Sequence, residues 1–233
     1  MSDESTEQHE QTPDEVFATA VLFETALAVV AIVLGWILGP SAREFVPELT
    51  SENLRPIIDG LWQGTLAAVP MLIVVELIRR IPWGPIRELE QLSDDQMIGA
   101  LVRLRVPELI MISVCAGVGE ELLFRGWLMG WFRDGISGFE PPVDPELLAL
   151  LLSSAVFGFF HPITKMYILL AGLMGVYFGV LLMWSGNLLV PIVAHAAYDA
   201  VQLLMTKRQV ERKERRVESD PNALEVGEEE IHD

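Results

Sequence analysis

The sequence predicts an all-α, polytopic membrane protein: a transmembrane helix bundle of about six spans between acidic, disordered termini. Of its 233 residues, 51% are hydrophobic and only 21% are charged, and the mean hydropathy is +0.37. Most of the charge lies near the two ends of the chain. Between them, apolar runs approach the roughly 20 residues that a bilayer-spanning helix needs. Polar loops and glycine-proline turns separate these runs, as expected for successive membrane helices.

The acidic charge belongs to the termini. Residues 1–16 contain six acids and residues 217–233 contain seven, and neither segment contains Lys or Arg. Segments this polar cannot bury enough apolar surface to fold, so we expect both to be disordered. The chain therefore divides into an acidic tail (1–16), a transmembrane helical domain (17–206), and a basic juxtamembrane segment that leads into a second acidic tail (207–233).

Six apolar runs are the candidate membrane segments. They cover residues 16–39, 57–78, 106–132, 147–160, 165–184 and 188–205. The fourth run is short and His161-Pro162 ends it, so we expect it to form a hairpin with the fifth that bends at or within the membrane boundary. Residues 86–104 mix charged and apolar positions, a pattern typical of an amphipathic helix on the membrane surface. Glu24 lies near the start of the first run, where its side chain is expected to snorkel to the interface.

The distribution of basic residues predicts the orientation. An even number of spans places both termini on one side of the membrane. The loops and the C-terminal segment on that side contain 12 Lys or Arg, against three on the other side. Because cytoplasmic loops carry the excess of Lys and Arg, we expect a multi-pass protein of the cell membrane with both termini in the cytoplasm. No basic stripe with interleaved aromatic residues occurs, so a nucleic-acid partner is not expected.

Three short polar motifs interrupt the later apolar runs. They are Glu120-Glu121-x-x-x-Arg125 in the third run, Phe157-x-x-x-His161 at the end of the fourth, and His195-x-x-x-Asp199 in the last. An ionisable side chain at the centre of a membrane helix costs about 2.5–3.5 kcal/mol on insertion scales. Hydrocarbon offers no water to such groups, so they must meet one another. We therefore expect the three motifs to share one functional site.

Helical spacing separates the roles of the two adjacent carboxylates. Glu121 and Arg125 are four residues apart, so they can form an ion pair on one face of a helix. Glu120 projects about 100° away from Glu121 and is the carboxylate that is free to face a cavity. A desolvated carboxylate can serve as a general base. Glu120, helped by His161, is thus placed to take a proton from a water that attacks a carbonyl group.

The third motif completes a hydrolytic site. His195 and Asp199 share one face of a helix, where they can stabilise an oxyanion or orient the attacking water. The Gly-x-Ser-x-Gly elbow of serine hydrolases and the His-Glu-x-x-His motif of zinc proteases are both absent from the sequence. We expect peptide-bond hydrolysis within the membrane and no cofactor. The alternative is a Zn²⁺ site with Glu120, His161 and His195 as ligands.

In this order on consecutive membrane helices, the motifs resemble those of the CPBP family, the CAAX proteases and bacteriocin-processing enzymes also called the Abi family. The resemblance covers about residues 105–205, including Leu-Phe-Arg-Gly after the two carboxylates and Leu-Val-Pro-Ile-Val-Ala before His195. It implies a glutamate-dependent, metal-independent intramembrane endopeptidase. The implied substrates are membrane-associated or lipidated, CAAX-type proteins.

The resemblance also implies roles for the motif residues. In the family, the first Glu and the second-motif His activate water, and the third-motif His with its partner stabilises the oxyanion. The implied catalytic residues are Glu120, Glu121, His161, His195 and Asp199, with Arg125 and Phe157 as orienting residues. This chain has Asp199 where the family often has Asn. An Asn amide can donate a hydrogen bond to an oxyanion and an ionised Asp cannot, so Asp199 is either protonated or orients His195 instead.

Other classes of function remain open on the sequence. A non-catalytic membrane protein of the bacteriocin-immunity or scaffolding type would keep the fold without turnover, but it would not need the whole polar set. A metal-dependent membrane hydrolase would differ from a glutamate protease in its sensitivity to chelators. A proton-coupled transporter is disfavoured, because the chain is short and shows no evident inverted repeat.

Overall fold

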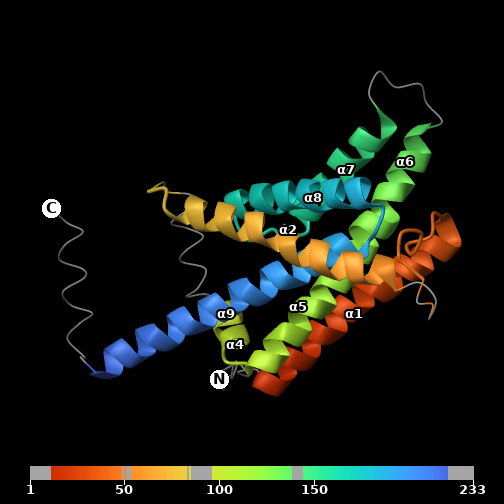
Figure 1. Ribbon diagram of the computed structural model, residues 1–233. Coiled ribbons are helices and arrows are strands. Elements are labelled where there is room, and N and C mark those ends of the chain that lie inside the picture. Colours follow the sequence, from red (N-terminus) through yellow and green to blue (C-terminus); the bar gives the residue numbers. More distant parts are fainter. Residues whose placement is uncertain are drawn as a thin grey trace, which may run out of the picture.

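The computed structural model describes residues 12–48, 50, 54–82, 84, 96–137 and 144–219. Within these residues the chain is helical and has no strand, which confirms the predicted all-α fold (Figure 1). The elements are α1 (Pro13–Leu38), α2 (Arg55–Arg79), α4 (Gln96–Val102), α5 (Val106–Glu121), the π-helix η2 (Leu122–Leu128), α6 (Met129–Ser137), α7 (Pro145–Phe159), α8 (Lys165–Ser185) and α9 (Leu189–Ser219).

Among the described residues, four helices are long and apolar enough to cross a membrane: α1, α2, α8 and α9 up to Arg216. The third predicted span consists of α5, η2 and α6, which follow one another without a break from Val106 to Ser137. The fourth is α7, an apolar helix of 15 residues. Residues 160–164 connect α7 to α8. The protein is therefore a multi-pass membrane protein.

The bundle exposes apolar side chains and buries polar ones. Leu22 and Trp36 of α1 and Ile73 of α2 are more than half exposed. Such a surface suits hydrocarbon rather than water as the surrounding medium. Conversely, Arg125 and His195 are buried. Polar residues of the motifs thus lie in the interior of the bundle, and apolar residues cover its outside.

The helices pack around α5 and α9. α1 lies along α5, α2 lies along α9, and α7 pairs with α8. An apolar cluster that contains Phe124 of η2, Phe157 of α7 and Ile192 of α9 joins these layers. The three polar motifs lie on the α5–η2 segment, at the end of α7 and on α9, so this packing brings them to one place.

Gly117 sets how closely α5 approaches α9. A Cβ at Gly117 would lie 2.7 Å from the carbonyl oxygen of Ile192 and 3.0 Å from the backbone nitrogen of Ala196. Both are backbone atoms, which cannot move aside as a flexible side chain can. A residue without a side chain therefore allows the close helix contact that places Glu120 opposite His195.

We expect Gly117→Ala to lower the stability of the bundle by about 1–3 kcal/mol, the usual cost of overpacking. Activity should fall as well, because α5 and α9 must move apart. Thermal unfolding in detergent measures the change in stability. Gly135→Ala on α6 is the matched control, since a Cβ there would meet nothing within 4 Å. Equal melting temperatures for the two variants would show that the close contact is not required.

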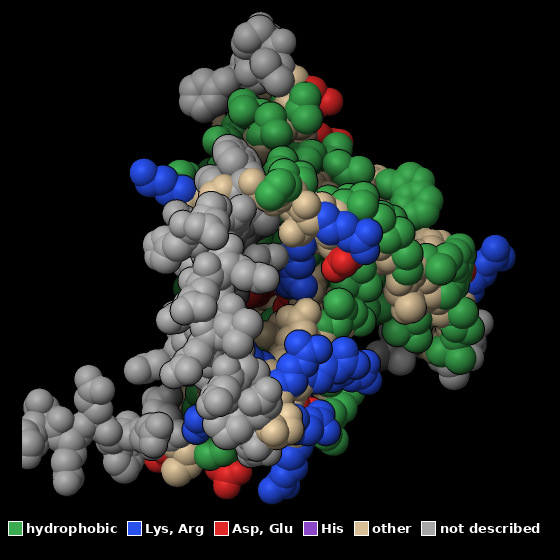
Figure 2. Space-filling model, turned by 90° about the vertical axis from the view of Figure 1, so that its left-hand side faces the viewer, with side chains coloured by type: hydrophobic (Ala, Val, Ile, Leu, Met, Phe, Trp, Pro, Cys, Tyr) green, Lys and Arg blue, Asp and Glu red, His purple; other side chains and the backbone are tan. Residues whose placement is uncertain are grey.

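The first turns of α1 and the later part of α9 meet at one end of the bundle. Val16 of α1 and Leu109 of α5 pack there with Leu203 of α9. Figure 2 views the molecule from the side toward which α2 and α9 run, and Lys and Arg side chains gather on this face. Arg80, which directly follows α2, and Arg208 of α9 are exposed basic residues. This gathering agrees with the one-sided charge of the sequence, while the cytoplasmic location of the termini stays a prediction.

The helical part of the chain is longer at both ends than expected. α1 begins at Pro13, inside the segment predicted to be a disordered tail. Thr12 explains this start: its hydroxyl accepts a hydrogen bond from the Glu15 backbone N–H at 3.3 Å, and the Glu15 carboxylate accepts one from the Thr12 backbone N–H at 2.8 Å. Such a capping box satisfies N–H groups that a helix start otherwise leaves unpaired. α9 likewise continues through the basic segment to Ser219.

Some predictions fall on residues that the structure does not describe. Residues 1–11 and 220–233 of the predicted acidic tails lie outside the described ranges. So do residues 86–95 of the predicted surface helix, of which α4 is the described helical part. These expectations stay predictions.

Candidate active site

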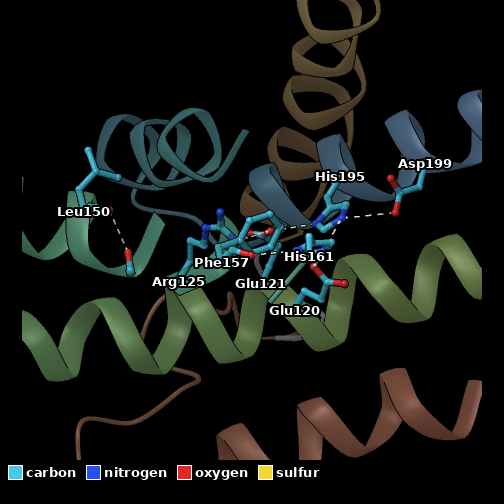
Figure 3. A network of polar contacts seen from close by, with 9 residues as sticks. Glu120, Glu121, Arg125, Leu150, Phe157, His161, His195 and Asp199 are labelled. Carbon is cyan, nitrogen blue, oxygen red and sulfur yellow. Dashed lines mark hydrogen bonds and ion pairs between the residues drawn. The ribbon is translucent and has the colours of Figure 1, made fainter. Parts of the chain in front are cut away.

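The three polar motifs meet in the interior of the bundle (Figure 3). Residues from α5 and η2, from the end of α7 and from α9 point toward one another there. All seven residues that the sequence singles out take part: Glu120, Glu121, Arg125, Phe157, His161, His195 and Asp199. Side chains from parts of the chain that are far apart in sequence thus form one polar network.

Glu121 is the fixed centre of this network. Its Oε1 accepts a hydrogen bond from Arg125 Nη1 at 3.0 Å and lies 2.9 Å from His195 Nδ1. The Arg125 guanidinium also lies over the rings of Phe157 and Phe178, at 4.3 and 5.3 Å from their centroids. Buried charges are tolerated only when they have well-placed partners. The Glu121–Arg125 pair predicted from the four-residue spacing is therefore confirmed.

The helix changes its winding at this pair. Glu121 is the last residue of α5, and Arg125 lies in the π-helical turn η2. In a π-helix the backbone hydrogen bonds run from residue i to i+5, a rare arrangement that is frequent at functional sites. The wider turn places Arg125 between α5 and the aromatic side chains of α7 and α8, where it meets both Glu121 and Phe157.

His195 is held between two carboxylates. Its Nδ1 lies 2.9 Å from Glu121 Oε1 and its Nε2 lies 3.3 Å from Asp199 Oδ2. The ring of Phe178 stacks on the imidazole, with centroids 4.8 Å apart and planes 13° from parallel. These contacts fix both the position and the tilt of the ring. An imidazole with N–H donors toward both carboxylates, or with the proton of one N–H shifted to its carboxylate partner, satisfies the arrangement.

His161 presents a lone pair to the site. Its Nδ1 lies 2.8 Å from the carbonyl oxygen of Phe157, which can only accept, so Nδ1 is the donor. In the neutral ring the other nitrogen, Nε2, is then an acceptor. This Nε2 faces Glu120 Oε2 at 3.8 Å. The hydrogen bond to the residue four positions earlier explains the Phe157-x-x-x-His161 spacing.

Glu120 faces both histidines without touching either. Its Oε2 lies 3.8 Å from His161 Nε2 and 4.0 Å from His195 Nε2. Both distances exceed a direct hydrogen bond, which ends near 3.2 Å, but a single water can bridge them. Within the described part of the chain this oxygen is buried without a hydrogen-bond partner. Such an atom in a native structure calls for an explanation, and a role toward water or substrate provides one.

The alternative Zn²⁺ site stays a prediction. Among the described residues, no group of three or more His, Cys, Asp or Glu side chains is arranged to hold a metal ion. This includes the alternative ligand set of Glu120, His161 and His195.

Two residues outside the motifs also reach the site. Phe178 lies in a uniformly apolar run, where no pattern distinguishes it from its neighbours. Glu24 was expected to snorkel to the interface. The structure instead buries its Oε2 without a hydrogen-bond partner among the described residues, on the part of α1 that contacts Gly119, the neighbour of Glu120. The sequence did contain a signal for Glu24, because it is a charged residue within the first apolar run.

Comparison with known proteins agrees with this site. Residues 103–201 match the family model described as Type II CAAX prenyl endopeptidase Rce1-like. This part of the chain, less than half of its length, is similar to the CAAX protease family. The matched range contains all three motifs and confirms the family resemblance seen over residues 105–205. No curated protein and no solved structure matches the chain. In general terms the match supports an intramembrane protease of the CAAX type.

Proposed function

We propose that the chain is a glutamate-dependent intramembrane endopeptidase in which Glu120 and His161 activate a water for attack on a peptide carbonyl. The observation that carries this proposal is the convergence of the Glu120 carboxylate and the His161 lone pair at 3.8 Å. A water between them has two acceptors for its protons. Such an arrangement increases the nucleophilicity of the water oxygen.

The remaining residues support the steps that follow. Glu120 takes a proton as the water oxygen adds to the carbonyl carbon, and it gives that proton to the leaving amine when the C–N bond breaks. His195 Nε2 lies 4.0 Å from Glu120 Oε2, and we assign its N–H to the oxyanion, to which it donates in exchange for its contact with Asp199. Asp199 contacts His195 Nε2 at 3.3 Å, which supports an orienting role for this carboxylate. The low polarity around the site strengthens each of these interactions.

We further propose that no metal is needed and that the substrates are membrane-associated or lipidated proteins. The side chains of His161 and Asp199 are about a quarter exposed, so the site is accessible at these residues. Phe159 and Phe160 precede His161 and are 69% and 63% exposed. They supply an apolar surface beside the site against which a substrate lipid chain can pack.

The test compares wild-type protein with Glu120→Ala in detergent. The substrates are quenched peptides that include prenylated C-terminal sequences, with and without a chelator. We expect the wild type to cleave in both conditions and Glu120→Ala to be inactive. Glu76→Ala is the matched control, because Glu76 also lies on a membrane helix but pairs with Arg80 at 3.0 Å, outside the site.

Two outcomes would contradict the proposal. Equal behaviour of wild type and folded Glu120→Ala would favour a non-catalytic role for the bundle. Activity that the chelator abolishes and an added metal restores would assign Glu120 and the two histidines to metal binding.

A further inference from the structure

Glu24 is a fourth acid of the site, and none of the three motifs contains it. It lies on α1, outside the range 103–201 that matches the CAAX protease family. α1 crosses α5 at the first motif, where a Cβ on Gly119 would collide with the carbonyl group of Glu24. The neighbouring residue of α5 is Glu120. Backbone contact between the two helices therefore holds Glu24 beside the proposed base.

The charges of this cluster do not balance if every carboxyl is ionised. The acids are Glu24, Glu120, Glu121 and Asp199, and the possible cations are Arg125, His161 and His195. His161 is neutral when its Nε2 is an acceptor, as the proposed function requires. Arg125 and a charged His195 then leave two negative charges in excess. Buried like charges repel one another strongly, so at least one carboxyl holds a proton.

The contacts indicate which carboxyl this is. Glu121 pairs with Arg125 at 3.0 Å, and Asp199 lies 3.3 Å from His195. Glu120 faces the imidazoles of both histidines. Glu24 has a buried Oε2 with no hydrogen-bond partner within the described part of the chain, as Glu120 does, but unlike Glu120 it pairs there with no imidazole or guanidinium. Among the described residues, Glu24 is thus the acid of the cluster that has no ion pair to a cation, and it is the carboxyl that we expect to hold the proton.

We propose that Glu24 is a positioning residue of this site, a neutral carboxyl that offers an O–H donor on the α1 side of Glu120. A donor at this position stabilises the ionised form of the base and helps to hold its orientation. The kinetic role rests on the proposed function, since it requires Glu120 to act as the base. The protonation of Glu24 rests on burial and charge alone, so it can be tested without any activity.

Infrared spectroscopy of the full chain in bilayers at neutral pH tests the protonation. A neutral carboxyl has a C=O stretching band that is separate from those of carboxylates and shifts on hydrogen–deuterium exchange. We expect this band in the wild type, in Glu120→Gln and in Thr25→Ala, an exposed neighbour on α1. Glu24→Gln should lose it. A band that survives in Glu24→Gln, or that disappears in Glu120→Gln instead, would overturn the proposal.

Kinetics of the same variants test the positioning role. Gln keeps a neutral donor of the same shape, so Glu24→Gln should retain kcat within about threefold, whereas Glu24→Ala should lower kcat about tenfold with KM unchanged. Thermal unfolding of each variant shows whether the fold is kept. Wild-type kcat in Glu24→Ala, or equal losses in the Gln and Ala variants, would overturn this role. A wild type without any cleavage would refute the proposed function, and the infrared result would still decide the state of Glu24.

Discussion

Replacing Arg125 by leucine is expected to cost about 3–5 kcal/mol of stability, because it removes one partner of a buried ion pair. The Glu121 carboxylate is fully buried and, among the described residues, would keep His195 alone as a partner. The stacking of the guanidinium on Phe157 would also be lost. Arg125→Lys should recover only part of the loss, since an ammonium group lacks the planar shape that contacts both the carboxylate and the ring.

The chain contains a matched control for this experiment. Glu76 and Arg80 form a pair with the same four-residue spacing and the same 3.0 Å distance, but their side chains are 47% and 71% exposed. Exposed pairs contribute about 0–1 kcal/mol, so Arg80→Leu should hardly change the melting temperature in detergent. Adding Glu121→Gln to Arg125→Leu removes the stranded charge and should raise the melting temperature again. Equal shifts for Arg125→Leu and Arg80→Leu would show that burial does not govern the cost.

The fold class and the site were predictable because the membrane limits where polar groups can lie. Each of the three motifs combines ionisable residues with an apolar run, and hydrocarbon leaves them no partners except one another. Helical geometry then separates Glu120 from the Glu121–Arg125 pair, and in the structure Glu121 pairs with Arg125 while Glu120 faces His161. Two local principles suffice for this step: polar groups avoid hydrocarbon, and successive residues of a helix point about 100° apart.

Other features depend on packing that a sequence pattern does not reveal. The π-turn η2, in which Arg125 lies, follows no signal in its apolar residues. Phe178 stacks on His195 because of how α8 and α9 cross, and any large apolar residue of α8 was an equal candidate. Glu24 lies near the start of its run, where snorkelling was the simplest expectation. The close approach of α1 to Gly119 instead leaves the Glu24 carboxyl Oε2 buried.

Glu120→Gln and His161→Ala are each expected to lower kcat by about 10²–10⁴-fold, the usual contribution of general acid–base catalysis. Both side chains act on the same water in the proposed mechanism. When one of them is removed, the other therefore contributes little to kcat. The double variant should therefore lose no more than about tenfold beyond the worse single variant. Single-turnover cleavage of the best peptide substrate measures the three losses on one scale.

Stability separates this pair of residues from Arg125. Glu120→Gln replaces a buried acid by a neutral group that costs less to desolvate, so its melting temperature should equal or exceed that of the wild type. A loss of activity without a loss of stability would then belong to chemistry and not to folding. Losses that multiply in the double variant would place Glu120 and His161 in different steps, and the shared water would have to be abandoned. Non-additive losses in a stable bundle would tie the two side chains to one water, as their 3.8 Å separation leads us to expect.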